Sequence, residues 1–182
     1  PVVIPPNFSV AFIGAVGDPC VKMALMPDGH IFLMEKISHI WILKDGVKLD
    51  PPFLDMTATT SLILEQSFYS MILGLDFINN GFVYLFYLMA INFTHNVVSR
   101  FMCDGTFADP GSEFVIHEFK ELESGIHLGG AMELGPDRRL YIAHGENSLG
   151  APAQDLNSTL GKMLRFNFDG SIPSENSFYT TF

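Results

Sequence analysis

The chain has 182 residues, of which 48% are hydrophobic, so it is long enough and apolar enough to fold as one domain with a sizeable core. Its formal net charge of −10 argues against a nucleic-acid-binding protein, because nucleic-acid phosphates would repel it. The apolar run from Phe82 to Ile91 is far shorter than the roughly 20 residues that a membrane-spanning helix needs. Composition therefore excludes disorder, and it argues against nucleic acid as a partner and against a membrane span.

A unit of two strands and two turns recurs along the chain. Each unit has a turn, an apolar strand, a variable loop and a second strand that ends in Asp-Gly, and the period is roughly 50 to 60 residues. The three units run from Met26 to Gly46, from Asp76 to Gly105 and from Gly135 to Gly170. Further apolar strands are predicted before the turns at 21–25, 71–75 and 131–134, and outer strands at 52–55 and 114–118.

The repeats predict an all-β fold. A small antiparallel sheet cannot bury both faces alone and must stack on its neighbours, while Gly, Pro and Asn interrupt nearly every helical window. The pattern favours a β-propeller, of which this chain covers about three four-stranded blades; an ordinary β-sandwich is the alternative. Because three blades do not close a ring, we expect residues 1–182 to form a partial propeller domain. The rest of the ring is expected beyond the C-terminus, or the chain pairs with another copy.

The third repeat carries the candidate site. His127 stands just before Gly129 and Gly130, and a hairpin later the chain reaches Glu146. The glycines let the backbone run close to something bulky, and a hairpin returns the chain to its starting edge, so His127 and Glu146 are predicted to share one rim. The alternative is a hairpin with a surface histidine and an acid beside a turn.

The sequence predicts no metal site within the chain. Cys20 and Cys103 form one disulfide or none, and neither has the close spacing of a metal motif. The segment from His144 to Glu146 has the H-x-E form of zinc deaminases, but their partner motif P-C-x-x-C is missing. Four other histidines are expected to be packed or solvated, not ligands: His30, His39, His95 and His117.

Several stretches together resemble the glucose/sorbosone dehydrogenase family, whose members are soluble quinoproteins that oxidise sugars on a six-bladed propeller. They are Pro27–Gly46, Asp76–Tyr84, His127–Asp137 and Gln154–Asn176. The run from Leu160 through Asn176 is the most specific of them. The resemblance covers almost the whole chain and corresponds to the first half of the family.

The resemblance implies a cofactor and a role for each site residue. Members of the family bind pyrroloquinoline quinone (PQQ) at the propeller axis, usually with Ca²⁺. A histidine takes the proton from the anomeric hydroxyl of the sugar while hydride passes to the quinone, and an external acceptor then takes the electrons. By resemblance His127 is the general base, Glu146 orients its imidazole, and Gln66, Gly129 and Gly130 contact the cofactor.

The resemblance also sets limits. It implies a periplasmic or secreted protein and places the calcium ligands in later blades beyond Phe182, so this chain alone is expected to be inactive. Where the family commonly has Gly-Leu-Leu-Gly, this chain has Ser67–Met71, and these larger side chains are expected to narrow the cofactor pocket. Arg138 replaces a turn glycine, and Glu146 replaces the usual aspartate. The alternative function is therefore a non-catalytic secreted propeller that acts as a binding module.

Overall fold

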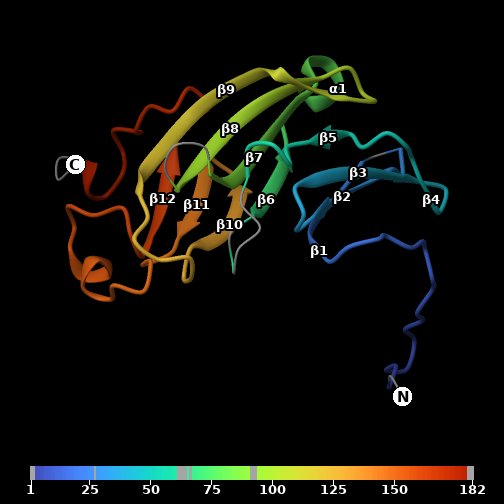
Figure 1. Cartoon of the computed structure of the whole chain (residues 1–182), viewed down its shortest axis with the longest axis horizontal. Coiled ribbons are helices and arrows are strands. Elements are labelled where there is room, and N and C mark those ends of the chain that lie inside the picture. The colour runs from blue at the N-terminus through green and yellow to red at the C-terminus, as the bar shows by residue number, and fades with distance from the viewer. Residues whose placement is uncertain (1–2, 27, 61–64, 66, 91–93, 180–182) are drawn as a thin grey trace.

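The chain folds into three antiparallel sheets that follow one another in sequence (Figure 1). This computed structural model describes residues 3–26, 28–60, 65, 67–90 and 94–179. The strands are β1 (Cys20–Leu25), β2 (Ile31–Glu35), β3 (His39–Lys44), β4 (Val47–Lys48), β5 (Leu54–Asp55), β6 (Phe68–Leu73), β7 (Phe82–Met89), β8 (His95–Cys103), β9 (Ala108–Glu121), β10 (Gly129–Leu134), β11 (Leu140–His144) and β12 (Lys162–Phe166). One helical turn, α1 (Phe77–Asn80), and one 3₁₀ turn, η1 (Ala151–Gln154), complete the described elements. The prediction of a mostly β fold is confirmed.

The first sheet has the order β1-β2-β3-β4, with the short β5 pairing with β3; the second has the order β6-β7-β8-β9, and the third β10-β11-β12. The expectation of four strands in each sheet is therefore right for the second sheet only. In the described residues the first sheet has five strands and the third has three. The reason lies at the sheet edges, where β4 and β5 are two-residue pairings that share one side of β3.

The repeated turns have a common hydrogen-bond pattern. In each, the first residue accepts a bond from the N–H three residues on and donates its own N–H to the carbonyl four residues on, at 26–30, 135–139 and 167–171. The fourth position has a left-handed backbone, with φ of 89° at Gly29, 60° at Arg138 and 85° at Gly170. A type I turn followed by a left-handed residue is a standard hairpin connection. Arg138 thus occupies a position at which glycine is strain-free.

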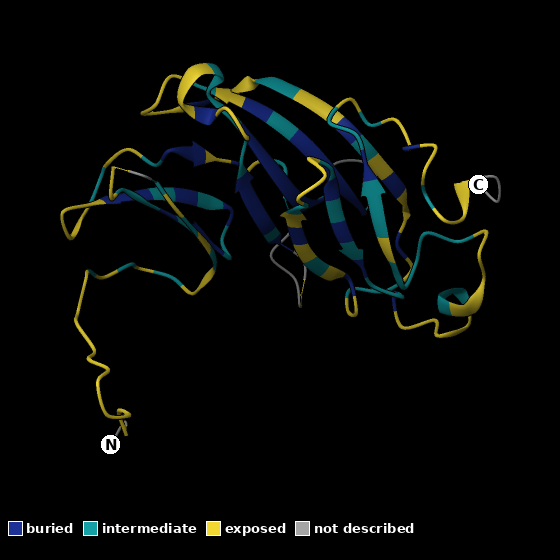
Figure 2. Cartoon of the chain, turned by 180° about the vertical axis from the view of Figure 1, so that it is seen from behind, coloured by how far each residue is buried: buried dark blue, intermediate teal, exposed yellow. Residues whose placement is uncertain are grey.

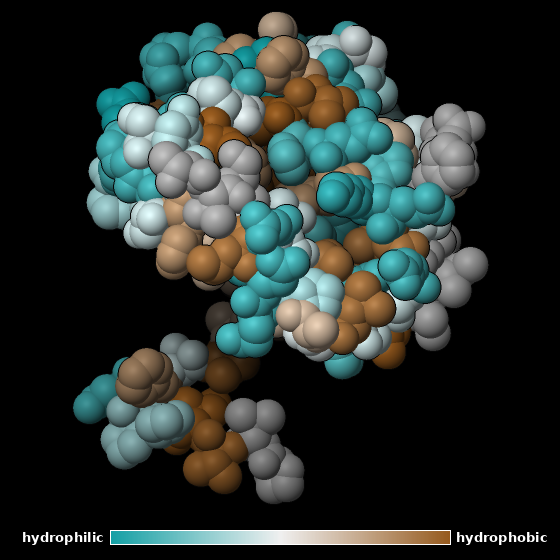
Figure 3. Space-filling view, turned by 90° about the vertical axis from the view of Figure 1, so that its left-hand side faces the viewer, coloured by the Kyte–Doolittle hydropathy of each residue, from teal (hydrophilic) through white to brown (hydrophobic). Residues whose placement is uncertain are grey.

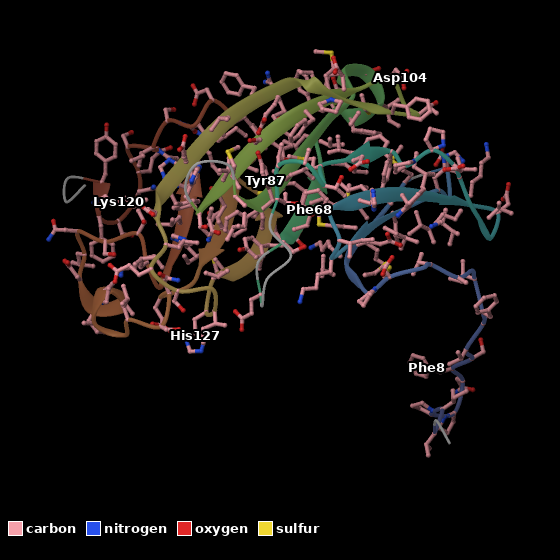
Figure 4. All side chains as sticks on the ribbon, viewed as in Figure 1. Phe8, Phe68, Tyr87, Asp104, Lys120 and His127 are labelled. Atoms are coloured by element: carbon pink, nitrogen blue, oxygen red, sulfur yellow. The ribbon has the colours of Figure 1, made fainter. Side chains whose placement is uncertain are left out.

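Two apolar layers hold the sheets together, one on each face of the second sheet. The layer toward the first sheet contains, among others, Phe32, Met34, Ile40, Phe68, Met71, Leu85 and Tyr87. The layer toward the third sheet contains Ile72, Tyr84, Phe86, Val98, Met132, Leu140, Ile142 and Phe166. The second sheet is consequently the most buried part of the chain (Figure 2), and the labelled Phe68 and Tyr87 lie in its interior (Figure 4). This burial explains the long apolar run of β7, which is covered on both faces.

Some predicted boundaries were wrong. The expected outer strand at 52–55 pairs only over Leu54–Asp55, and the expected strand at 114–118 is the middle of the longer β9. The first strand of the second sheet, β6, begins at Phe68 and not at Met71. Cys20 and Cys103 are both free thiols, so the disulfide does not form. Within the described ranges, no helix is long and apolar enough to cross a membrane.

The first strands of the three sheets lie side by side, because β6 contacts both β1 and β10. Lys22 of β1 and Glu133 of β10 form an ion pair that joins the first sheet to the third. The strands β1, β6 and β10 therefore form one row. The candidate site lies at the end of this row where β10 begins.

Candidate active site

His127 and Glu146 meet at one rim of the third sheet, as the hairpin predicted. Gly129 of β10 pairs with His144 of β11, which brings the segment before β10 next to the segment after β11. His127 Nδ1 and Glu146 Oε1 form a hydrogen bond. The imidazole is 57% exposed and the carboxylate 26% exposed, and His127 points out of the molecule in Figure 4. The pair is therefore formed in the folded chain and open to a ligand.

Glycines allow this close approach of two backbone segments. A side chain at Gly145 would collide with the carbonyl oxygen of His127, and one at Gly129 would collide with that of Ala143. Gly129 also has a left-handed φ of 89°, and the register of the hairpin shifts by a bulge between Gly129 and Met132. The Gly-Gly pair after His127 is thus needed first for the bulge. The space that a side chain would take is filled by the backbone of residues 143–145 at Gly129 and borders Tyr69 at Gly130.

The carboxylate of Glu146 is ionised and fixed at both oxygens. Its Oε2 accepts a hydrogen bond from the Gly150 N–H at 2.7 Å, and its Oε1 is the partner of His127. The Gly150 N–H, followed by the His127 side chain, lowers the pKa of Glu146 below its usual value. An ionised carboxylate only accepts, so Nδ1 of His127 must carry a proton. In the neutral tautomer with its proton on Nδ1, the imidazole has its accepting nitrogen at Nε2.

Glu65 ties the His127 turn to the second sheet. Its Oε2 accepts a hydrogen bond from the His127 backbone N–H at 2.7 Å, and its own N–H donates to the Gly125 carbonyl at 3.3 Å. His127 has a left-handed φ of 57°, which is unfavourable for a side chain of this size. A charge-assisted bond to the backbone of His127 helps to hold that conformation.

Asn147 ties the same turn to the third sheet. Its side chain is buried, with 1% of the residue exposed. Its Oδ1 accepts from the backbone N–H groups of Glu123 at 2.7 Å and Ser124 at 3.1 Å, and its Nδ2 donates to the Ser124 carbonyl at 2.7 Å. Its backbone N–H donates to the His127 carbonyl at 3.0 Å. The residue after Glu146 therefore anchors the loop that carries His127.

The segment Ser67–Met71 lies mainly in the interior. Four of its five residues are buried, and Tyr69 packs on the ring of Phe86 at 5.1 Å between centroids. The Tyr69 hydroxyl is buried with no hydrogen-bond partner among the described residues, and this burial raises its pKa, with a smaller effect of the Glu65 charge. An added side chain at Gly130 would meet Tyr69 Cβ at 3.5 Å, so Tyr69 lies beside the backbone of this glycine. The expected narrowing of a cofactor pocket stays a prediction; Gln66 lies outside the described residues.

His144 stands opposite Gly129 in the hairpin, but its side chain turns into the interior. His144 is buried, donates from Nδ1 to the Thr159 carbonyl at 3.2 Å and lies on the ring of Phe119. Burial lowers the pKa of His144 to about 4, so the residue is neutral near pH 7. Among the described residues, no group of three or more His, Cys, Asp or Glu side chains could hold a metal ion.

A cavity of about 580 Å³ lies between β12 and the segment 172–179, on the side of the third sheet away from β10. Figure 3 views the molecule from this side and shows hydrophobic atoms between hydrophilic ones. Its apolar lining includes Met163, Leu164, Ile172, Phe178 and Tyr179. In the described residues β12 is the edge strand of its sheet, and the cavity lies along this edge. His127 and Glu146 do not line the cavity.

A sequence model of the family described as glucose / sorbosone dehydrogenase matches residues 18–181. The chain belongs to the glucose/sorbosone dehydrogenase family. This confirms the resemblance that the motifs of the chain indicated.

The chain is also similar to individual proteins. The uncharacterized protein slr1608 of Synechocystis sp. is 30% identical over 86% of this chain and 42% of its own length. Aldose sugar dehydrogenase YliI of Escherichia coli (strain K12) is 38% identical over 35% of this chain and 17% of its own length. The PQQ-bound form of aldose sugar dehydrogenase from Streptomyces coelicolor has the same fold, with a TM-score of 0.81 at 22% identity over 93% of this chain and 50% of that one. The chain thus spans half or less of the length of these proteins.

Two residues at the rim of this glucose/sorbosone dehydrogenase chain were not found from sequence. Glu65 acts through an exposed contact 62 positions from His127, and no spacing rule points to it. Asn147 left a weak signal, since asparagine tolerates the left-handed backbone, and its φ is 55°. That signal is typical of turns in general and does not mark a site.

Proposed function

We propose that this chain is part of an aldose dehydrogenase that oxidises the anomeric carbon of a sugar with hydride transfer to PQQ. Membership of the glucose/sorbosone dehydrogenase family supports the reaction class, and the PQQ-bound relative supports the cofactor. The observation that carries the proposal is the exposed His127–Glu146 pair at the rim of the third sheet. An imidazole beside a fixed carboxylate is suited to abstracting a proton from a hydroxyl group.

The rim fits a planar cofactor in two respects. Gly129 and Gly130 place backbone without side chains next to the His127–Glu146 pair, and the large side chains of Phe68 and Met71 turn into the apolar layer toward the first sheet. We propose that His127, Gly129, Gly130 and Gln66 contact PQQ, which supplies a two-electron acceptor for the hydride of the sugar. No calcium ligands are proposed within this chain; they are expected in the later part of the protein.

The protein residues then have separate tasks. Nε2 of His127 accepts the proton of the anomeric hydroxyl as the C1–H bond breaks, so the oxidised sugar leaves as a lactone. Glu146 keeps the proton on Nδ1, which aims the unprotonated Nε2 outward, and it stabilises the imidazolium that forms. The imidazolium releases its proton to water before the next turnover.

We also propose that residues 1–182 form about three blades of a six-bladed propeller, completed by later parts of the polypeptide. The three successive antiparallel sheets support this architecture. A periplasmic or secreted location, an external electron acceptor and homo-oligomerisation belong to the same proposal and rest on family resemblance.

The test uses the full-length protein reconstituted with PQQ and Ca²⁺, with dye reduction followed for several aldoses. His127→Ala should leave PQQ binding largely intact, because the proposed contacts from Gly129, Gly130 and Gln66 remain. It should lower turnover by about two to four orders of magnitude, because the general base is lost. Glu146→Gln should cost less, since it keeps the shape and removes only the charge.

A wild-type protein that neither binds PQQ nor oxidises any sugar would refute the enzyme. The non-catalytic binding module would then take its place.

A further inference from the structure

The loop that carries His127 and the strand end that carries Glu146 are joined through one buried side chain. Asn147 follows Glu146 directly, and its amide makes three hydrogen bonds to the backbone of Glu123 and Ser124. Its backbone N–H bonds to the carbonyl of His127 itself. A displacement of Asn147 would therefore move both members of the pair relative to each other.

We propose that Asn147 is the positioning residue of the His127–Glu146 pair. Its buried amide holds the 123–127 loop at the spacing at which Nδ1 meets the carboxylate, and so holds Nε2 in its outward orientation. The inference rests on the proposed function for its catalytic consequence, but not for the geometry of the pair.

The chemistry of the position fits an amide better than its alternatives. Two N–H donors and one carbonyl acceptor of the loop face the side chain, so the partner must both accept and donate. An aspartate would keep the accepting oxygen and lose the donor. A glycine would keep the left-handed backbone, where φ is 55°, and lose every side-chain bond. Asn147→Gly thus separates the amide contacts from the backbone conformation.

Glu65 does not make the same connection. It fixes the backbone N–H of His127 to the segment before β6, in the second sheet, whereas Glu146 belongs to the third sheet. Glu65 is exposed, and Asn147 is buried. The hydrogen bonds of Asn147 are therefore shielded from water. Among the described residues, they are the only side-chain hydrogen bonds that link the end of the strand before Glu146 to the backbone of residues 123 and 124.

Asn176 offers a matched control. It also makes two side-chain hydrogen bonds, both to Arg165, at 3.0 Å each. Arg165 pairs with Tyr141 near the start of β11, so Asn176 lies toward the opposite end of the third sheet from Glu146. Asn176→Ala should lower stability without affecting the pair.

The first measurement needs no cofactor: the titration of the Glu146 carboxyl by NMR in the full-length apoprotein labelled at glutamate. Contact with His127 is one cause of the lowered pKa of Glu146, so Asn147→Gly should shift its midpoint toward higher pH. Asn176→Ala should leave it unchanged. An unchanged midpoint in Asn147→Gly overturns the proposal. If that variant does not fold, Asn147→Asp, which keeps two of the three bonds, should show the ring of His127 displaced from Glu146 by a lost NOE contact, and an intact contact overturns the proposal.

The second measurement is a double-mutant cycle on kcat in the reconstituted full-length protein. Asn147→Gly should lower kcat by about tenfold to a hundredfold with little change in KM. It should lower kcat much less in a Glu146→Gln background, because the contact it supports is already weakened. Effects that multiply would show a general structural role and overturn the proposal. If the wild type oxidises no sugar, the proposed function fails while the titration still decides the role of Asn147.

Discussion

His144 makes the stability of this fold depend on pH. The residue is 4% exposed and lies between the second and third sheets, with ring centroids 4.1 Å from Phe119 and 6.5 Å from Phe86. Its Nε2 is buried with no hydrogen-bond partner among the described residues. Burial lowers its pKa from 6.5 to about 4, and a smaller contribution in the same direction comes from His117. Protonation of His144 is therefore coupled to unfolding.

The sign and size of the effect follow from that pKa. The unfolded chain takes up a proton near pH 6.5, whereas the folded chain resists it until about pH 4, so stability falls as the pH drops through this window. At about 1.4 kcal/mol per pH unit, the full loss is about 3 kcal/mol below pH 4. About 2 kcal/mol of it should already be lost between pH 7.5 and pH 5.

His144→Leu removes the titrating group and keeps an apolar side chain against the two rings. It gives up the bond to the Thr159 carbonyl, so at pH 7.5 its free energy of unfolding should lie within about 1 kcal/mol of wild type. At pH 5 the wild type should have lost about 2 kcal/mol more than the variant. His117 is present in both proteins, so its own titration cancels in the comparison.

The assay is urea unfolding of dilute protein at several pH values between 7.5 and 5, followed by far-ultraviolet circular dichroism. The measurement at pH 7.5, where both proteins have a neutral residue 144, is the internal control. Stability curves of wild type and variant that run parallel between pH 7.5 and pH 5 would refute the coupling of His144 to unfolding.

Two further predictions concern the turns and the open faces. Arg138→Gly should raise the free energy of unfolding by about 1 kcal/mol in urea melts at pH 7.5, because Arg138 has a left-handed φ of 60°; an equal or lower stability would contradict this. The 182-residue chain should self-associate in light scattering at micromolar concentration, because β1 exposes Val21, Met23 and Leu25 at 41%, 60% and 65%, and the double variant Met23→Lys, Leu25→Lys should associate less. A wild-type chain that is strictly monomeric would argue against open blade faces.

Local sequence rules predicted the hairpins well, because the conformation of a turn depends on residues that are adjacent in the sequence. Asp45 and Gly46 have left-handed φ angles of 49° and 80°, a conformation typical of Asp-Gly turns. They form the two-residue loop between β3 and β4, as the Asp-Gly pair predicted. The same logic brought His127 next to Glu146 across one hairpin. Edge strands were predicted poorly, since β4 and β5 depend on which neighbour is free and not on their own two residues.

Contacts between distant segments could not be predicted from one sequence. The ring of Tyr69 packs against Phe86 from another strand, and nothing in the sequence around Tyr69 indicates that partner. The role of Asn147 depends on a loop 23 and 24 positions away. An asparagine, serine or glutamate in a loop does not indicate in the sequence which distant residue its side chain will hydrogen-bond.

The stacking of three sheets in chain order has a consequence for synthesis of the protein. The sheets occupy consecutive segments, 20–55, 68–121 and 129–166, and each is built mainly from hairpins. Chains emerge from the ribosome N-terminal end first, so the second sheet can dock on the first while the third is still being made. Its other face, with Ile72, Tyr84 and Phe86, stays uncovered until Met132 and Ile142 arrive. A nascent chain paused near residue 122 is therefore the form that most needs a chaperone.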